Sequence, residues 1–458
     1  MSTATMQRVT AAFRSGPLAV RSFRLLAGGQ FASTIGDYCY AVALPWLVLS
    51  NHGTTVLLGI VLACYGVPRT VLIPVGGMLA DKFGPRTLML YADALRCVLV
   101  GVLAFLAARH TASLVTLGPT AALIGAGEGL FLPASFSIMP SLLDDDRLAA
   151  GNALNSTAIQ VGSLIGPAIG GALVAITGAS TAAFGIDAVS FAVSAASLAL
   201  IPRRAAAASM AGDPEAADSL TGEADSLTGL ADSGPGTPAA GPDGPAAEPA
   251  VKQQGVLAYI RQSRAMQIII VVAIAANLSN GGLGEVALPA LVHAHWGAAG
   301  YGALLACMAA GAVIGTLVAA RTGRLRNPAM LASGSFVVES AAISLIPFLG
   351  GEAGAAAALL FLGICNGLGN VLFYTMAQRS IPRAILGRVL SVIMLCSFGT
   401  FPLSVAVAGV LVRHIGTTPF FPIAGVFLVI AVLGGNTQRA FRDFGRKAEP
   451  SKREGQLA

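Results

Sequence analysis

The chain has 458 residues, of which 55% are hydrophobic and only 11% charged, whereas an average soluble domain carries about 25% charged residues. Its mean hydropathy is +0.74 and its formal net charge is +6. This composition excludes an ordinary soluble enzyme, a collagen-like chain and a fully disordered chain. It predicts a protein that crosses a membrane many times.

Twelve apolar stretches are long enough to cross a bilayer, which takes about 20 residues in a helix. Six of them precede residue 202 and six follow residue 262. This pattern predicts an all-α integral membrane protein with twelve transmembrane helices in two pseudo-symmetric six-helix bundles. The predicted spans are residues 25–49, 55–80, 88–108, 113–139, 151–177, 181–201, 267–292, 301–320, 329–349, 354–376, 389–412 and 417–436.

The segment between the two halves, residues 202–262, is rich in Pro, Gly, Ala and Ser and contains almost no large apolar residue. Because it cannot bury a core, we predict a disordered cytoplasmic linker, with a docking or regulatory arm as the alternative to a simple tether. The predicted divisions are a cytoplasmic N-terminal segment (1–24), an N-terminal six-helix bundle (25–201), the linker (202–262), a C-terminal six-helix bundle (263–437) and a basic cytoplasmic tail (438–458).

The distribution of basic residues predicts the orientation in the membrane, because cytoplasmic loops carry an excess of Lys and Arg. The chain has 28 Lys and Arg residues. If the N-terminus is inside, only Arg109 and Arg413 fall in external loops, Arg69 and Arg96 lie within spans, and all the others are cytoplasmic. We therefore predict a multi-pass protein of the inner (plasma) membrane with both termini in the cytoplasm.

The loop after the second span has the pattern G-x-x-x-D-[RK]-x-G-x-[RK], formed by Gly77, Asp81, Lys82, Gly84 and Arg86. Gly77 permits close approach of helices, and Gly84 can adopt the positive φ of a tight turn. The three charged residues are expected to form a cytoplasmic latch that faces the start of span 11. The alternative is that Lys82 and Arg86 only reflect the general excess of basic residues in cytoplasmic loops and form no latch.

Span 5 contains a glycine motif made of Gly162, Gly166, Pro167, Gly170 and Gly171. Glycines four residues apart lie on one face of a helix, and proline removes a backbone hydrogen bond and bends the helix. The motif therefore predicts a smooth, kinked packing surface. We expect the two bundles to move across the part formed by Gly166, Pro167, Gly170 and Gly171.

The loop motif resembles the signature loop of the major facilitator superfamily, except that Pro85 stands where a basic residue is usual. The span-5 motif is similar to one that accompanies proton-coupled exporters more than importers in that superfamily. Further stretches resemble drug:proton antiporters, a subgroup that includes macrolide exporters: residues 36–37, 44–47, 127–128, 131–134 and 186–191. The resemblance implies alternating access to a central cavity, with an inward proton exchanged for an outward amphiphilic molecule such as an antibiotic.

Several carboxyl groups lie inside predicted spans, where a charged group costs about 2.5 to 3.5 kcal/mol and must face a cavity, pair or be protonated. Burial favours the protonated form of a carboxyl group, which lets it carry a proton between two sides. We interpret Asp37 and Glu128 as the main residues for proton coupling or substrate binding. Glu285, Glu339 and Arg69 are further candidates for the same role.

One pair of opposite charges inside a predicted span is interpreted as structural. Asp93 and Arg96 are three residues apart on one helix face, which predicts a local ion pair. Asp187, near the outer end of span 6, is also interpreted as structural.

Motifs of other protein classes are missing from the sequence. It has neither G-x-x-x-x-G-K-[ST] nor H-E-x-x-H, and its six cysteines show no C-x-x-C spacing. We therefore expect no enzymatic activity, no cofactor and no metal site. The expected partners are a small-molecule substrate, protons and the lipid bilayer, without nucleic acid, and the protein is expected to act as a monomer. A solute importer, a siderophore or metabolite exporter, and a non-transporting membrane receptor or scaffold remain as alternatives.

Overall fold

The computed structural model describes residues 16–51, 53–109, 111, 113–202, 256–322, 328–381 and 383–438. The predicted N-terminal segment up to residue 15, linker residues 203–255 and the tail from residue 439 lie outside these ranges. Within them, twelve helices are long and apolar enough to cross a membrane. The predicted class, all-α with twelve spans, is confirmed.

Six long helices form the N-terminal bundle. They are α2 (Arg21–Ser50), α3 (Thr55–Phe83), α4 (Pro85–Ala108), α5 (Leu114–Ser137), α7 (Asp145–Thr177) and α8 (Thr181–Leu200), with the short helices η1 (Pro17–Ala19) and α6 (Met139–Leu142) beside them. Thr54 caps the start of α3 by accepting a hydrogen bond from the Leu57 amide at 3.2 Å. Between α3 and α4, Gly84 adopts φ 83°, which confirms the turn predicted there.

The C-terminal bundle begins with a short helix and has one span interrupted by a π-helical turn. Its elements are α11 (Val256–Gln262), α12 (Arg264–Gly282), η3 (Leu283–Ala287), α13 (Leu288–His295), α14 (Gly297–Thr322), α15 (Pro328–Leu345), η4 (Ile346–Phe348), α16 (Glu352–Ser380), α17 (Arg383–Ile415) and α18 (Thr417–Asn436). The π turn η3 joins α12 and α13 into span 7.

The predicted linker is wrong for its last seven residues, because these form α11. Tyr259 and Ile260 pack against an apolar cluster that contains Met266 of α12. This local apolar pattern is hidden when the composition is averaged over the whole segment.

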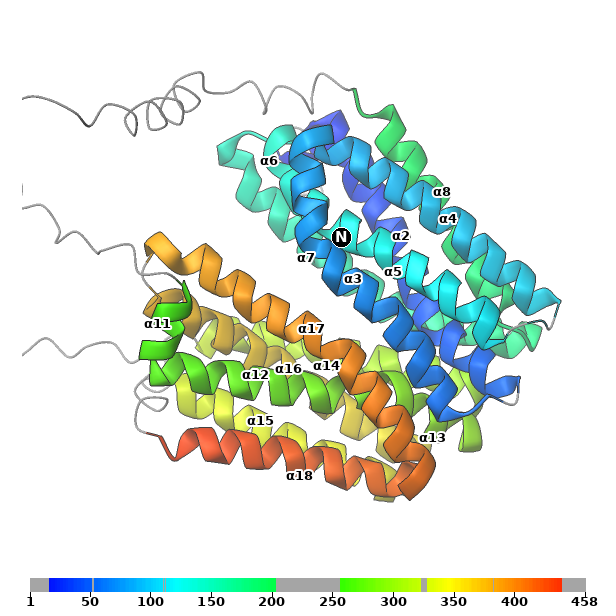
Figure 1. Ribbon diagram of the computed structural model, residues 1–458, viewed down its shortest axis with the longest axis vertical. Coiled ribbons are helices and arrows are strands. Elements are labelled where there is room, and N and C mark those ends of the chain that lie inside the picture. The colour runs from blue at the N-terminus through cyan, green and yellow to red at the C-terminus, as the bar shows by residue number, and fades with distance from the viewer. Residues whose placement is uncertain are drawn as a thin grey trace, which may run out of the picture.

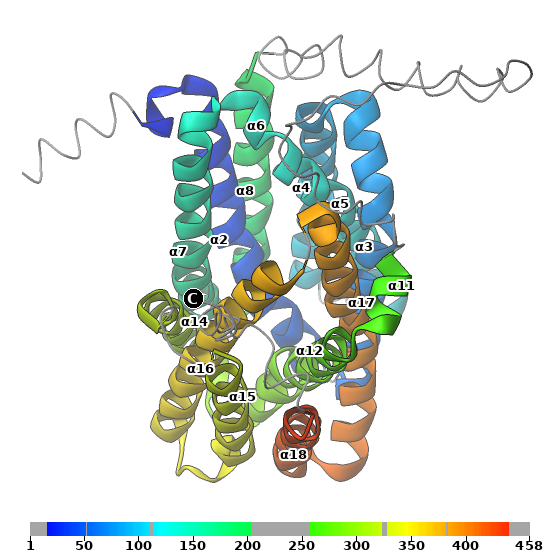
Figure 2. The same ribbon diagram turned by 90° about the vertical axis from the view of Figure 1, so that its left-hand side faces the viewer.

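The two bundles contact each other at one end of the molecule and diverge toward the other (Figure 1). The Thr55 hydroxyl of α3 donates to the Gly409 carbonyl of α17 at 3.0 Å. Ser50 of α2 lies 3.2 Å from the His293 ring nitrogen of α13. We call this the closed end, and the end where α3 finishes and α12 begins the open end. Figure 2 shows α7 meeting α14 on one side of the molecule and α3 beside α17 on the other.

Candidate functional site: a central cavity with paired charges

Three adjacent chambers lie between and within the bundles. The N-chamber, about 390 Å³, is lined mainly by α2, α3, α5, α7 and α8. The middle chamber, about 360 Å³, lies between the bundles, and the C-chamber, about 380 Å³, lies within the C-terminal bundle. Tyr38 and Glu285 line both the N-chamber and the middle chamber, whereas Asn280 and Asn366 line both the middle chamber and the C-chamber. The shared walls make one series of chambers across both bundles.

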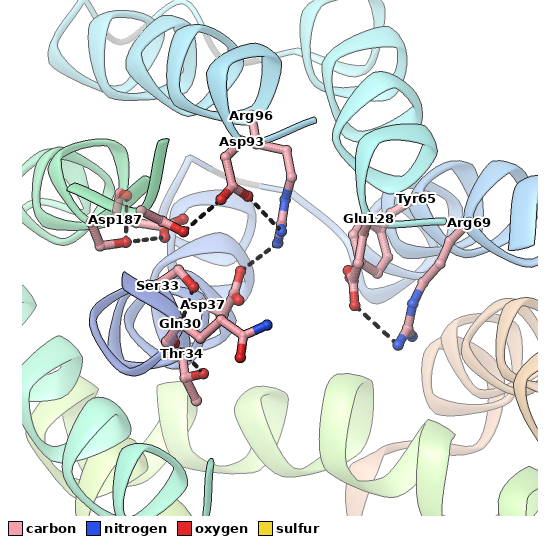
Figure 3. A network of polar contacts seen from close by, with 12 residues as sticks. Gln30, Ser33, Thr34, Asp37, Tyr65, Arg69, Asp93, Arg96, Glu128 and Asp187 are labelled. Carbon is pink, nitrogen blue, oxygen red and sulfur yellow. Dashed lines mark hydrogen bonds and ion pairs between the residues drawn. The ribbon is translucent and has the colours of Figure 1, made fainter. Parts of the chain in front are cut away.

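Asp37 of α2 pairs with Arg96 of α4 at the wall of the N-chamber (Figure 3). An Arg96 Nη2 hydrogen is donated to Asp37 Oδ1 at 2.6 Å. The Asp37 side chain is 43% exposed and the Arg96 side chain only 4%. The guanidinium lies 4.0 Å from the centre of the Phe191 ring, a cation–π distance. Asp37 therefore faces the cavity while Arg96 is held behind it.

The same guanidinium lies near a second carboxylate, Asp93. Arg96 Nη1 is 3.9 Å from Asp93 Oδ1, and the Ser194 hydroxyl of α8 donates to Asp93 Oδ2 at 2.6 Å. Asp93 is fully buried. Asp93 and Arg96 lie close together, as expected. However, the shorter contact of Arg96 is with Asp37 on another helix, and the three-residue spacing of Asp93 and Arg96 does not predict this contact.

Glu128 of α5 forms the second pair, with Arg69 of α3. Arg69 Nη2 is 3.0 Å from Glu128 Oε1, and the Tyr65 hydroxyl donates to Glu128 Oε2. The Arg69 guanidinium also lies 4.9 Å from the centre of the Phe398 ring, which belongs to α17. This pair, which Figure 3 shows together with Tyr65, therefore contacts the other bundle through Arg69.

Asp187 of α8 also lines the N-chamber although it is 1% exposed. Its Oδ1 accepts a hydrogen bond from the Ser190 hydroxyl at 3.4 Å, and its Oδ2 has no hydrogen-bond partner among the described residues. A Cβ on Gly36 would lie 2.5 Å from Asp187 Oδ1. Gly36 thus allows α2 to approach this carboxyl group closely.

Glu285 and Glu339, the two acidic residues that lie away from the helix ends in the described C-terminal bundle, have different surroundings. Glu285 is partly exposed in the π turn and lines the N-chamber and the middle chamber; such turns are frequent at functional sites. Glu339 of α15 is 0% exposed and accepts hydrogen bonds from Asn280 Nδ2 at 2.9 Å and Asn366 Nδ2 at 3.1 Å.

The residues of the loop motif lie at the junction of α3 and α4, where the structure describes part of their surroundings. Arg86 is buried and donates to the Ala199 carbonyl at 2.8 Å, so it connects α4 to α8. Asp81 and Lys82 are exposed. The side chains at the start of α17 lie outside the described residues, and the predicted contact with span 11 stays a prediction.

The close helix approach expected at Gly77 occurs at its neighbour instead. A Cβ on Gly77 would meet nothing within 4 Å, whereas a Cβ on Gly76 would lie 2.9 Å from the Gly129 carbonyl oxygen and 2.8 Å from Pro133 of α5. Consecutive residues of a helix point about 100° apart, so only one of this glycine pair can face α5.

The glycine motif of span 5 serves two contacts, not one. Gly162, Gly166 and Gly170 face α2 of the same bundle, because a Cβ at these positions would contact its residues Thr34, Ile35, Tyr38 and Cys39. Gly171 faces the other bundle, where its Cβ would lie 2.9 Å from the Gly302 Cα of α14, and the Pro167 carbonyl oxygen also approaches Gly302. Gly166 and Gly170 therefore pack within the N-terminal bundle and do not form the expected surface between bundles, whereas Pro167 and Gly171 lie at that surface.

Comparisons with known proteins agree with this architecture. The family model described as "Major Facilitator Superfamily" matches residues 26–404. The multidrug efflux pump Tap of Mycolicibacterium fortuitum is 28% identical over 168 residues, covering 35% of this chain and 40% of that protein. The staphyloferrin A transporter of Staphylococcus aureus is 28% identical over 150 residues, covering 32% and 37%.

The matched stretches thus span about two fifths of these relatives' length. Among solved structures, a POT family transporter in complex with 5-aminolevulinic acid has a TM-score of 0.69 at 14% identity, covering 93% of this chain and 97% of that one. The chain belongs to the major facilitator superfamily and is a multi-pass membrane protein.

Proposed function

We propose that this transporter exports an amphiphilic small molecule, such as an antibiotic, in exchange for protons. The observation that carries the proposal is an excess of acid inside the membrane. Away from the helix ends, the described spans contain six carboxyl groups but only two guanidinium groups. The residues are Asp37, Asp93, Glu128, Asp187, Glu285 and Glu339 against Arg69 and Arg96. Because unpaired charges in a low-dielectric interior are costly, protons or a cationic cargo must neutralise some of these acids.

The geometry around Arg96 supports a mechanism for proton coupling. Asp37 holds the guanidinium at 2.6 Å, and Asp93 lies 3.9 Å away on the other side. Protonation of Asp37 removes its negative charge, so the guanidinium is attracted to Asp93. Loss of the proton restores the first pair. Asp37, which is the more exposed of the two carboxyl groups, exchanges protons with the cavity.

The pair of Arg69 and Glu128 supports coupling between charge and conformation. Arg69 contacts Phe398 of α17 as well as Glu128. A change in the charge of Glu128 therefore alters a contact between the bundles. With the topology expected from the basic residues, the open end faces the cytoplasm, and cargo enters the series of chambers from that side before the bundles move. Tap is named as a multidrug efflux pump, which is consistent with this direction.

The proposal is tested in inside-out membrane vesicles under an imposed pH gradient, with a panel of hydrophobic antibiotics. We expect Asp37→Asn to abolish gradient-driven uptake, because its side chain cannot release a proton, while exchange of labelled for unlabelled substrate continues. Asp93→Asn is expected to slow gradient-driven uptake, because Arg96 then lacks its alternative partner. Glu352→Gln, at an exposed glutamate at the start of α16, is the control and is expected to behave as wild type.

Two results would contradict the proposal. Uptake by Asp37→Asn equal to wild type would dismiss this residue as the coupling group. Uptake by the wild type that is the same with and without the pH gradient, for every compound of the panel, would dismiss proton exchange.

A further inference from the structure

Glu339 is buried without a positive partner. It is 0% exposed, and the ion pairs found among the described residues involve only Arg69 and Arg96 of the other bundle. Its Oε1 accepts two amide hydrogens, but its Oε2 is buried and has no hydrogen-bond partner in the described part of the chain. A buried carboxylate is stable only when it is paired or neutralised. The proton exchange described above gives Glu339 no role.

Hydrogen-bond direction fixes how the neighbouring amides are turned. An ionised carboxylate can only accept hydrogen bonds, so Asn280 and Asn366 both present their N–H groups to Glu339. Asn370 Nδ2 in turn donates to Asn366 Oδ1 at 2.9 Å. The chain of amides therefore points its positive ends toward Glu339. The oxygen ends of Asn280 and Asn370 remain as acceptors at the far ends of this network.

Both ends of the network reach the wall of the C-chamber, which Asn280 and Asn370 line. The other polar residues of the wall are Asn277, Asn366 and Ser397, and its aromatic residues are Phe336, Phe373 and Phe398. The chamber volume of about 380 Å³ is in the range of small-molecule sites. Amide oxygens together with phenyl rings favour a positively charged group, because both carry negative potential.

We propose that the C-chamber binds the positively charged nitrogen of the exported molecule, an organic ammonium group. The ammonium group contacts the amide oxygens of Asn280 and Asn370, and Glu339 is a positioning residue that supplies the counter-charge through these amides. This assignment rests on the proposed export function, because the ligand is its cargo. It places cargo recognition in the C-terminal bundle, apart from Asp37 and Glu128.

A metal ion fits the chamber less well than an organic cation. Ca²⁺ and similar ions need several oxygen atoms at about 2.3 to 2.6 Å, and the described residues contain no group of three or more acidic, histidine or cysteine side chains that could hold one. Phe336, Phe373 and Phe398 add phenyl rings to the chamber wall, and phenyl rings do not coordinate such an ion.

The test compares two probes of equal shape with the full-length protein in lipid nanodiscs. The probes are (4-hydroxyphenyl)trimethylammonium, which is permanently charged, and 4-tert-butylphenol, its neutral counterpart. Binding is measured by equilibrium dialysis without any gradient, and binding to empty nanodiscs is subtracted. We expect the wild type to prefer the cation. Glu339→Gln keeps the size and the acceptor oxygen but removes the charge, and we expect it to weaken cation binding at least tenfold.

Binding of 4-tert-butylphenol checks that the variant protein is folded, and we expect it to stay within about twofold of wild type. Glu339→Asp should restore part of the preference for the cation, whereas the control Glu352→Gln should leave both probes unaffected. Equal cation binding by wild type and Glu339→Gln overturns the inference. The inference is also overturned if sodium chloride displaces the bound cation and N-methylglucamine chloride does not. In that case the chamber binds an inorganic ion.

The two proposals fail separately. If the preference for the cation is absent while gradient-driven uptake in vesicles is intact, only the C-chamber assignment is wrong. If the preference for the cation is present but uptake does not depend on the pH gradient, the proposal of proton exchange is wrong and the C-chamber assignment stands.

Discussion

Adding a single methyl group at Gly171 should open the closed end. A Cβ at this position would lie 2.7 Å from the Ala298 carbonyl oxygen and 2.9 Å from the Gly302 Cα, both of them backbone atoms of α14. Ordinary contacts begin at 3.4 Å, so α7 and α14 must separate by about 0.7 Å. Since no flexible side chain can yield, the separation has to come from movement between the bundles.

The size of the effect follows from the cost of overpacking. An extra methyl group in a well-packed interface costs about 1 to 3 kcal/mol. The cost applies only to the conformation in which α7 and α14 are in contact. Gly171→Ala is therefore expected to lower the ratio of molecules with a closed end to molecules with an open one by about 5- to 150-fold.

The tryptophans of the chain provide the assay. The chain has two, Trp46 and Trp296, and both lie at the closed end. The Trp46 ring centre is 4.7 Å from that of His293 across the bundle interface. In a Trp296→Phe background, Trp46 is the single tryptophan, and its quenching by acrylamide measures how far the closed end is open. We expect Gly171→Ala to increase this quenching.

Two alanine variants serve as controls. A Cβ on Gly170 would lie 2.9 Å from the Cys39 Cα within the N-terminal bundle, so Gly170→Ala should lower thermal stability without changing the exposure of Trp46. A Cβ on Gly101 would meet nothing within 4 Å, so Gly101→Ala should match wild type in both measurements. If Gly171→Ala gives the same quenching as Gly101→Ala, the contact between Gly171 and Gly302 does not hold the closed end together.

Two further predictions concern the Thr55 hydrogen bond between the bundles and the turn at Gly84. Thr55→Val removes the 3.0 Å hydrogen bond to the Gly409 carbonyl, worth about 1 kcal/mol; we expect the quenching of Trp46 to rise by less than in Gly171→Ala, and an unchanged value would argue against this contact. Gly84→Ala forces a Cβ into a backbone with φ 83° where no neighbour lies within 4 Å, at a cost of about 1 to 3 kcal/mol. The thermal midpoint of the purified protein should fall, and a midpoint equal to wild type would show that the turn adapts.

The fold could be predicted almost completely from the sequence, because a bilayer requires each span to satisfy its own backbone hydrogen bonds. The length of an apolar run therefore predicts where a spanning helix lies. The turn at Gly84 could likewise be predicted, from the glycine in the loop motif. Contacts between helices were harder to predict from the sequence. Gly76 and Gly77 are equivalent in sequence, and only the rotation of α3 decides which of them faces α5.

The candidate site was predictable in its residue types but not in its pairing. Arg96 lies one turn from Asp93 on the same helix, which suggested that pair, yet its shorter contact is with Asp37, 59 positions earlier in the chain. Tyr65 could have been found from its position four residues before Arg69 on one helix face. The amides around Glu339 come from α12 and α16, and no spacing in the sequence connects these helices to α15.

Under the proposed exchange of protons for cargo, the surplus of carboxyl groups over guanidinium groups also affects how the protein responds to membrane voltage. If one proton enters for each monovalent cation that leaves, the cycle moves no net charge and is driven by the pH difference alone. If two protons enter, each turnover moves one charge and gains about 2.3 kcal/mol per 100 mV. The number of acidic side chains that change protonation in one cycle thus decides whether voltage alone can drive accumulation of the cargo when both sides have the same pH.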